Sequence, residues 1–537
     1  MNNRIRIFLP LIIALAVVGG IVIGRHMKQP LPGNKSLFSF KPSQFSKINE
    51  IINLINDEYV DTVNDKKLVE SAIKAMLENL DPHSTYIPAE DLKAYTEPLE
   101  GGFDGIGIEF HIQDDTIMVV AAVSGGPSEE LGIQSGDRIV SVEGKNVAGT
   151  GIRNEDVLRM LRGKRGTQVN ISIMRRGVDK LIDYEITRDK IPINSIDAGY
   201  MVTNDIGYIR IGQFGATTYD EYRNIFMQLS EKGMSKLILD LRDNPGGYLQ
   251  TAIKMADEFL PENKLIVYTR GKSRPHENYL ATSRGFFEEG EMTVLIDEGS
   301  ASASEIVAGA LQDWDRATII GRRSFGKGLV QEQTPLPDGS ALRLTIARYY
   351  TPTGRSIQKP YSEGYSEYVR ELFDRQAHGE LEISDSIHFA DSLKFTTPGG
   401  KTVYGGGGIM PDVFVPLDTS FVSSFYSDAF SKGLFGQFAY DYVDENRSLM
   451  AGYKGLDKFT RSFFVSDDLY KRFVKYAYDK GVAKDDEGVR RSTEKIKLTL
   501  KALMARQLWK GNGFYAVINS GDKTVIKAIE VLEKKNQ

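Results

Sequence analysis

The spacing of hydrophobic positions along the chain changes several times. From residue 43 to about residue 98 they recur every three to four positions, which predicts an N-terminal helical region. Two groups of residues carry this repeat: Ile48, Ile51, Ile52 and Ile55, followed by Leu68, Ala72, Ala75, Met76 and Leu80. We expect the second helix to end before Asp81, because the residue that precedes a proline disfavours helical conformation.

Beyond residue 98 the pattern becomes that of strands. Residues 99–190 contain short runs such as TIMVVAAV (116–123), separated by Gly, Asp and Asn, and one helical stretch at Glu155–Leu161. Residues 191–417 mix buried strands with helices, and residues 418–537 are again helical. The chain is therefore predicted to be a multidomain α+β protein. A β-rich module precedes, or is inserted into, an α/β core with a mixed sheet, and helical regions stand at both ends.

The first residues form a different kind of segment. An uncharged, mostly apolar stretch runs from Ile7 to Gly24, after Arg4 and Arg6. Eighteen residues form a helix of about 27 Å, close to the thickness of the hydrocarbon core of a bilayer. We expect a transmembrane signal anchor at 7–24 and a linker at 25–42, with a cleaved signal peptide as the alternative. Basic residues flank the stretch on both sides, so charge counting leaves its orientation open.

The composition limits the kinds of catalytic and binding chemistry that the chain can carry out. The net charge is −5, which is unlike a nucleic-acid-binding protein, and we expect no nucleic-acid partner. The chain has no cysteine, which excludes disulfides, thiol catalysis and zinc–thiolate sites. Its six histidines are too scattered for an HExxH motif. We therefore expect no metal and no other cofactor, and chemistry must depend on hydroxyls, carboxylates, lysines or the backbone.

One candidate nucleophile lies at a predicted helix start. The segment GSASASEI (299–306) follows a strand, and Ser302 and Glu305 have the spacing of a capping box, in which the serine only satisfies backbone donors. The alternative is functional. Small neighbours leave room for a substrate, and free N–H groups at a helix start, such as that of Ala303, can bind an oxyanion.

A candidate base follows in GRRSFGKGLVQ (321–331). Apolar neighbours would lower the pKa of Lys327, and Gln331 shares a face with it in either a helix or a strand. A solvated loop lysine is the simpler interpretation. The same segment resembles a P-loop, but it lacks the final Ser or Thr and a following helix, which argues against nucleotide binding.

Two glycine patches complete the candidate chemistry. Gly246 and Gly247 follow the buried strand LILDLR, where they either form a turn or allow close backbone approach to an oxyanion. Gly105, Ile106, Gly107 and Ile108 enter another strand, where consecutive N–H groups can bind a carboxylate. A glycine bulge would give the same pattern.

In this order, these segments resemble the carboxy-terminal processing (tail-specific) serine protease family with a PDZ domain. The resemblance covers residues 45–417 and includes LVESAIKAMLENLDPHSTYIPAED (68–91), FDGIGIEF (103–110), GPSEELGIQSGDRIVSVEG (126–144), LILDLRDNPGG (237–247), GSASASEIVAGALQD (299–313) and VYGGGGIMPDV (403–413). It implies a PDZ domain at 99–190 and a ClpP/crotonase-like protease core at 191–417. The C-terminal helical region at 418–537 lies outside it.

The resemblance also implies roles for individual residues. Ser302 would be the nucleophile of a serine endopeptidase, Lys327 the general base, and Gln331 the residue that positions the lysine. Gly246, Gly247 and Ala303 match the oxyanion region, and Glu305 and Asp313 match acidic supporting positions. Gly105, Ile106, Gly107 and Ile108 would bind the free, apolar C-terminus of a misfolded or precursor protein substrate.

The family further implies a location and leaves alternatives. Its bacterial members act outside the cytoplasmic membrane, so we expect residues 1–6 in the cytoplasm, a single pass through the inner membrane, and a periplasmic catalytic part. A homodimer or higher oligomer is possible on the sequence. The competing function is a catalytically silent PDZ adaptor on a protease-like scaffold.

Overall fold

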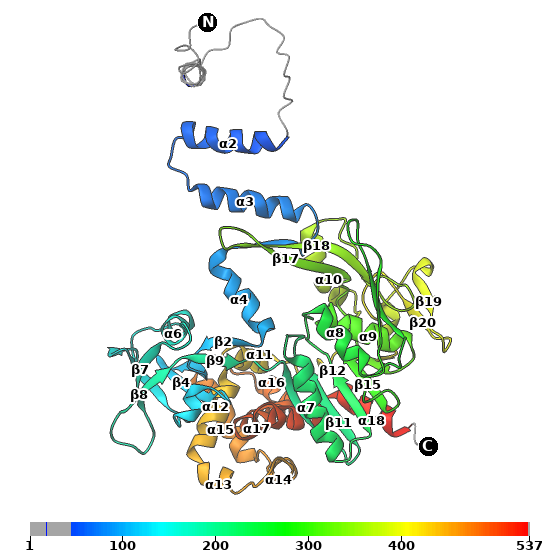
Figure 1. Ribbon diagram of the computed structural model, residues 1–537. Helices are drawn as coiled ribbons and strands as arrows, with labels where there is room; N and C mark the ends of the chain where they lie inside the picture. The colour runs from blue at the N-terminus through cyan, green and yellow to red at the C-terminus, as the bar shows by residue number, and fades with distance from the viewer. Residues whose placement is uncertain (1–17, 19–43, 535–537) are drawn as a thin grey trace, which may run out of the picture. The chain divides into compact units, whose positions relative to one another are not determined.

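The structure is a computed structural model that describes Val18 and residues 44–534 (Figure 1). The chain divides into two compact units, Met1–Ala72 and Ile73–Gln537. The first contains α2 (Gln44–Glu58), and α3 (Asp65–Glu78) crosses the boundary. Apart from Val18, the predicted anchor at 7–24 lies outside the described residues. Within the described part of the chain, no helix has the length and apolar character needed to span a membrane.

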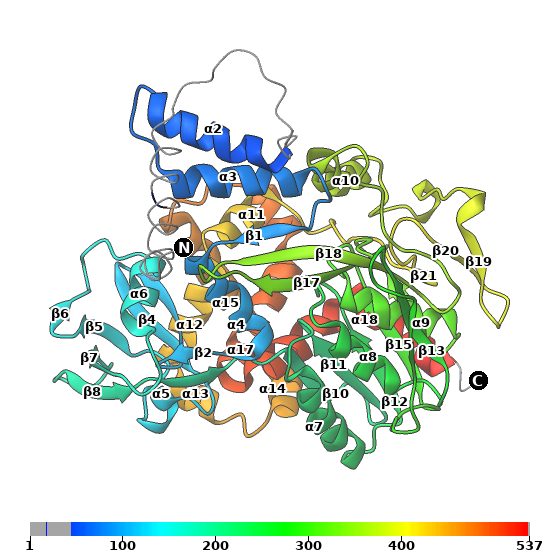
Figure 2. The ribbon, with the colours of Figure 1, turned by 45° about the horizontal axis from the view of Figure 1, so that its top comes forward.

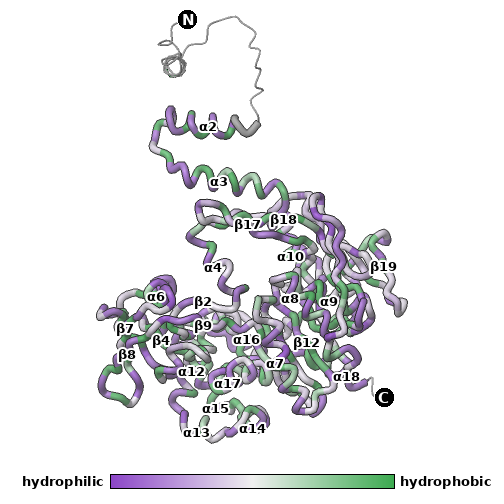
Figure 3. Tube along the Cα trace, in the orientation of Figure 1, coloured by the Kyte–Doolittle hydropathy of each residue, from purple (hydrophilic) through white to green (hydrophobic). Residues whose placement is uncertain are grey.

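A central six-stranded sheet forms the core of the second unit. Its strands, in spatial order, are β10 (Ile196–Met201), β11 (Ile206–Ile211), β12 (Lys236–Asp240), β15 (Glu291–Ile296), β16 (Thr318–Gly321) and β21 (Val413–Phe414). β10 is antiparallel to β11, and all the other neighbours are parallel. Parallel strands are buried on both faces, which explains the continuous apolar runs of the sequence and their hydrophobic colour in Figure 3.

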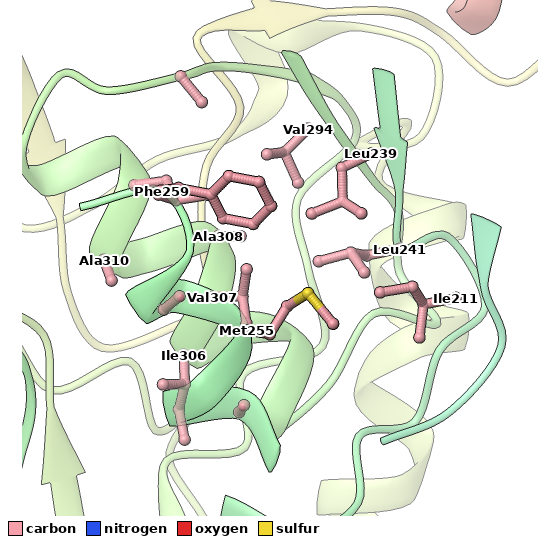
Figure 4. Close-up of a cluster of buried hydrophobic side chains, with 14 of the residues drawn as sticks. Ile211, Leu239, Leu241, Met255, Phe259, Val294, Ile306, Val307, Ala308 and Ala310 are labelled. Atoms are coloured by element: carbon pink, nitrogen blue, oxygen red, sulfur yellow. The ribbon is translucent and has the colours of Figure 1, made fainter. Parts of the chain in front are cut away.

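Helices cover both faces of this sheet. On one face lie α7 (Thr218–Glu231), α8 (Leu249–Asp257) and α9 (Ala303–Asp313), and Figure 4 shows Leu239 and Val294 of the sheet close to Met255 and Phe259. The opposite face is covered by α18 (Lys523–Lys534). The apolar residues of this second cluster include Tyr208, Ile238, Leu295, Val525, Ala528 and Leu532. The last helix of the C-terminal region thus completes the α/β core.

A second sheet lies around the long strand β18 (Ala341–Tyr350). Its other strands are β1 (Thr85–Ile87), β13 (Leu265–Arg270), β14 (Glu277–Leu280) and β17 (Leu329–Pro335). β1 belongs to the region predicted as helical, yet it pairs with the Ala341 end of β18 (Figure 2). Three residues are too few for the alternation that reveals a strand in a sequence. After β18 come α10 (Tyr365–Ala377) and the hairpin of β19 (Lys394–Thr396) and β20 (Thr402–Tyr404).

The β-rich module follows α4 (Ala89–Glu100). β2 (Gly102–Gly105) and β9 (Asp189–Pro192) pair at its base. Its sheet consists of β3 (Ile108–Gln113), β4 (Thr116–Ala122), β5 (Arg138–Val142), β6 (Lys145–Asn146), β7 (Gln168–Met174) and β8 (Ile182–Thr187), with helices α5 (Pro127–Glu130) and α6 (Asn154–Leu161). The module has an apolar core separate from that of the central sheet, which includes Ile117, Val157 and Val169.

The C-terminal region forms a helical bundle. It comprises α11 (Ser424–Ser431), α12 (Leu434–Glu445), α13 (Arg447–Ala451), α14 (Leu456–Ser462), α15 (Asp467–Asp479), α16 (Asp486–Arg491) and α17 (Thr493–Ile518). Its core contains Leu469, Phe473, Ile496 and Leu500. The bundle contacts the β-rich module through an Arg176–Asp444 ion pair of 2.9 Å. It also contacts β10, where the Gly199 N–H donates to Asn512 Oδ1 at 2.8 Å.

Candidate active site

The candidate residues meet where parallel strands of the central sheet end. In such sheets, the loops at the carboxyl ends of the strands form the binding crevice. Gly246 follows β12, Ser302 follows β15, and Lys327 follows β16. All three line one cavity of about 560 Å³, together with Gly247, Ala303 and Gln331. Residues that are far apart in the sequence therefore form one site.

Ser302 combines a helix-capping position with an unusual backbone conformation. It lies at the start of α9 with φ 55° and ψ −110°, a region that residues other than glycine rarely adopt and that persists only at overdetermined sites. Ser302 and Glu305 form a capping box at the start of α9, in which the Ser302 N–H donates to Glu305 Oε2 at 2.8 Å. The capping box predicted from the sequence is therefore present, and Ser302 also lines the cavity.

Glu305 connects the two loops that carry Ser302 and Lys327. Its fully buried carboxylate accepts hydrogen bonds from the N–H groups of Ser302 (2.8 Å), Gly326 (2.7 Å) and Lys327 (2.9 Å), and from the Ser324 hydroxyl (2.5 Å). Burial raises the pKa of Glu305, although these donors oppose the shift. Glu305, for which we expected a supporting role, thus acts as a clamp that binds the backbone N–H groups of both loops.

Tyr349 is a second clamp that the sequence analysis missed. Its buried hydroxyl lies 3.1 Å from the carbonyl oxygen of Ser302 and also contacts the carbonyl oxygen of Lys327. Burial raises the pKa of this hydroxyl well above its usual value, so it remains a donor. Glu305 and Tyr349 together bind the N–H and C=O groups of both Ser302 and Lys327. Tyr349 gives no motif signal, because its contact depends on how β18 packs against the two loops.

Lys327 is held as a desolvated amine. Its Nζ donates to Gln331 Oε1 at 3.0 Å. Burial lowers the pKa of Lys327, and the nearby Arg343 cation lowers it further. Among the described residues, no hydrogen bond joins Nζ to the Ser302 hydroxyl, although both groups line the cavity. The strand β17, rather than a helix, follows Lys327, which removes the structural context of a P-loop.

The glycine patch places open donors beside Ser302. A side chain on Gly246, which has φ +99°, would lie 2.8 Å from Ser302 Cβ and 2.9 Å from the Ala303 nitrogen. The N–H of Gly246 itself donates to Asn244 Oδ1 at 2.9 Å. Gly247 lies between Gly246 and Tyr248, which both form backbone hydrogen bonds with Phe214. Because successive residues of a strand direct their N–H groups to opposite sides, the Gly247 N–H points away from Phe214. Gly247 and Ala303, which both line the cavity, remain the candidate oxyanion donors.

Asp313 lies away from this chemistry. It is at the far end of α9 and does not line the cavity. Its carboxylate forms a fully buried ion pair with Arg355 at 2.7 Å and accepts a hydrogen bond from the Thr353 hydroxyl at 2.7 Å. Since a buried carboxylate needs such partners, its role in this structure is to hold the loop after β18 against α9.

The predicted carboxylate-binding loop lies apart from the cavity that contains Ser302. Gly105 pairs within β2, and Gly107 has φ +76°. The carbonyl of Ile106 accepts from the N–H and hydroxyl of Ser128, at 3.1 and 2.6 Å, and the carbonyl of Gly107 accepts from the Val123 N–H at 2.9 Å. These bonds use the carbonyl oxygens and fix the loop. Gly105, Ile106, Gly107 and Ile108 do not line the cavity that contains Ser302.

One histidine approaches the base, which sequence distance could not reveal. Nε2 of His83 is 2.8 Å from the Tyr368 hydroxyl. Burial and the Lys327 charge lower the pKa of His83 to about 4. Its imidazole does not line the cavity, so it is not placed to take a proton from Ser302.

The fold and the site are those of a serine peptidase that carries a PDZ domain. Models of peptidase family S41, of a PDZ domain and of the N-terminal domain of the activating protease CtpB match residues 205–364, 118–175 and 25–91. A family of unknown function matches residues 425–511 of the helical bundle.

Curated relatives match longer stretches of the chain. The carboxy-terminal-processing protease of Bartonella bacilliformis is 39% identical over 66% of this chain and 84% of the relative. The carboxy-terminal processing protease CtpA of Bacillus subtilis is 35% identical over 67% of this chain and 76% of the relative. A solved photosystem II D1 C-terminal processing protease is 26% identical over 70% of this chain and 88% of that one, with a TM-score of 0.37.

The chain thus belongs to peptidase family S41, among the carboxy-terminal processing proteases. This confirms the resemblance and the fold class that we drew from the sequence, and it confirms that the chain is a serine peptidase.

Proposed function

We propose that this serine peptidase is a membrane-tethered endopeptidase that uses Ser302 and Lys327 as a dyad and recognises the free C-termini of proteins. One observation supports the dyad above all. Burial and the Arg343 cation lower the pKa of the Lys327 amine, and Lys327 and Ser302 line the same cavity. A neutral amine is the form that can accept a proton.

The proposed reaction uses groups already in place. The Ser302 hydroxyl attacks the scissile carbonyl and gives its proton to Lys327 Nζ. The N–H groups of Gly247 and Ala303 bind the resulting oxyanion. Lys327 then protonates the leaving amine, which leaves an acyl-enzyme, and water hydrolyses this ester with Lys327 again as base. Gln331 orients the amine in both steps.

Substrate selection is assigned to the PDZ domain. The loop of Gly105, Ile106, Gly107 and Ile108 has its carbonyls engaged in the fold, which favours N–H groups as the ligands for a terminal carboxylate. Apolar residues around this loop favour apolar tails. Because the loop and the cavity are separate, one region of the enzyme would hold the chain end while the other cuts upstream of it.

The location is proposed from the sequence. Residues 7–24 carry no charge and match the thickness of a bilayer, which supports a single anchor in the bacterial inner membrane with the catalytic part in the periplasm. Membrane fractionation of the full chain and protease treatment of spheroplasts test this. Recovery of the full-length protein in the soluble fraction would contradict it.

The dyad is tested by substitution. Ser302→Ala and Lys327→Ala should each retain the circular dichroism spectrum of the parent and lose cleavage of an unfolded protein. Ser273→Ala and Lys272→Ala change the same residue types on an exposed loop and should remain active. Full activity of either dyad variant would overturn the mechanism. Binding of tails without turnover by the parent would favour the adaptor alternative.

Tail recognition has its own test. An unfolded substrate with an apolar tail is compared with a copy whose terminal carboxylate is amidated. The acid should be cleaved about tenfold faster or more, because the amide cannot supply the charge that the loop binds. Equal rates would refute recognition of the carboxylate while leaving the dyad intact.

A further inference from the structure

A buried turn from the N-terminal region reaches the active site. It spans Asp81–Ser84, between α3 and β1. The Asp81 carboxylate accepts from the N–H groups of His83 and Ser84, both at 2.9 Å, from the Ser84 hydroxyl at 2.6 Å, and from the Thr345 hydroxyl at 3.0 Å. Burial alone would raise the pKa of Asp81, but these donors lower it overall. The carboxylate therefore organises the whole turn.

The turn is attached to the strand opposite Gln331. Thr345 of β18 is the cross-strand partner of Gln331 in β17, and its N–H donates to the Ser84 hydroxyl at 3.1 Å. The register of β17 shifts between Val330 and Gln331, as at a β-bulge. At this position the carbonyl oxygen of His83 accepts a hydrogen bond from Gln331 Nε2. The turn is thus hydrogen-bonded to Gln331, the residue that accepts a hydrogen bond from the Lys327 amine.

This contact decides which way the Gln331 amide faces. A carbonyl oxygen can only accept, so Nε2 must face His83 and Oε1 must face Lys327. With Oε1 accepting an N–H of Lys327, the lone pair of the neutral amine is directed elsewhere. If the amide were reversed, Nε2 would donate into that lone pair and block proton transfer.

We propose that the Asp81–Ser84 turn is a positioning element of the dyad, which through the His83 carbonyl fixes the Gln331 amide and so leaves the Lys327 lone pair free for Ser302. This inference rests on the proposed dyad and adds residues that do not touch substrate. The His83 ring is engaged elsewhere, in an edge-to-face contact with Tyr368, so the main-chain oxygen is the acting group.

A double-mutant cycle tests the proposal. Asp81→Asn removes the anionic acceptor of the turn, and Gln331→Ala removes the amide through which the turn acts. In the parent, Asp81→Asn should lower kcat about tenfold with KM changed less than twofold. In the Gln331→Ala background the same substitution should change kcat by less than about twofold, because groups acting as one unit are not additive. A merely structural role would give equal effects in both backgrounds.

Controls keep the outcome decisive. Ser84→Ala is a milder change in the same turn and gives a second cycle if Asp81→Asn does not fold. Asp91→Asn alters an exposed aspartate of the adjacent helix α4 and should leave kcat unchanged. Additive effects in the cycle would overturn the proposal. Activity of Lys327→Ala would instead overturn the dyad, so the two failures are distinguishable.

Discussion

The two halves of the active site are held in different ways. On the nucleophile side, Ser302 is placed by a strained backbone at a helix start and by Gly246, where any side chain would collide. On the base side, Lys327 is held through its amine by Gln331, which depends on a turn more than two hundred residues earlier in the chain. Glu305 and Tyr349 join the backbones of both sides.

The position of the nucleophile and the protonation state of the base are therefore controlled by different interactions. The nucleophile side depends mainly on backbone geometry. A base defined by side-chain hydrogen bonds and burial can be retuned by a single polar change. Substitutions on the first side should therefore act on rate or stability directly, and those on the second should act through pH.

The largest effect is expected from Gly246→Ala. The added Cβ would lie within 3 Å of Ser302 Cβ and the Ala303 nitrogen, in a conformation with φ +99°. We expect kcat to fall about 10³-fold, as when an oxyanion donor is lost. Gly436→Ala, on a helix position with open space, is the matched control. Near-normal turnover of Gly246→Ala would mean that the nucleophile side is not rigid.

Glu305→Gln should destabilise the fold. The amide has one acceptor oxygen where the carboxylate accepts from four donors, so buried N–H groups lose their partners. We expect a loss of about 3 kcal/mol of unfolding free energy, measured by urea titration. Glu367→Gln, an exposed change in α10, should have no measurable effect. An unchanged midpoint of urea unfolding for Glu305→Gln would show that Glu305 does not stabilise the two loops.

Gln331→Glu should alter the pH dependence. A carboxylate beside Lys327 favours the ammonium form and so raises the pKa of the base. The rise of kcat/KM with pH then moves to higher pH, and activity near neutrality falls about tenfold. A pH–rate profile from 6 to 10 measures this, with Gln228→Glu, an exposed change on α7, as the control. A profile that keeps its midpoint would show that Gln331 does not contact the functioning base.

The smallest effect is expected for Lys327→Met. Because burial lowers the pKa of Lys327, the folded state binds fewer protons than the unfolded state between the lowered pKa and the ordinary value of 10.5. The lysine therefore costs stability at neutral pH, and the cost fades as pH rises toward 10.5. Lys327→Met should gain about 0.5–1 kcal/mol at pH 7 by thermal unfolding and less at pH 10. A loss of stability at pH 7 would contradict a desolvated amine.

The sequence predicted most of this arrangement, and the exceptions share a cause. Ser302, Gly246 and Lys327 follow buried parallel strands. Such strands can be recognised in a sequence as apolar runs, and their carboxyl ends lie at the same edge of the sheet. Tyr349, the His83 carbonyl and the strand Thr85–Ile87 act through packing between distant segments. Neither periodicity nor motif spacing encodes which loop meets which strand, and a main-chain oxygen leaves no trace in residue identity.

The position of α18 has a consequence for the order of synthesis. Tyr208, Ile238 and Leu295 are made roughly halfway along the chain, yet their apolar cover, Val525 and Leu532, is made last. Lys236 likewise waits for the Leu532 carbonyl, to which it donates at 3.1 Å. A nascent chain cannot cover this face of its central sheet with α18 before that helix emerges, and exposed apolar strands keep such intermediates loosely packed. Translation itself would thus delay assembly of the proteolytic centre until the whole bundle has been produced.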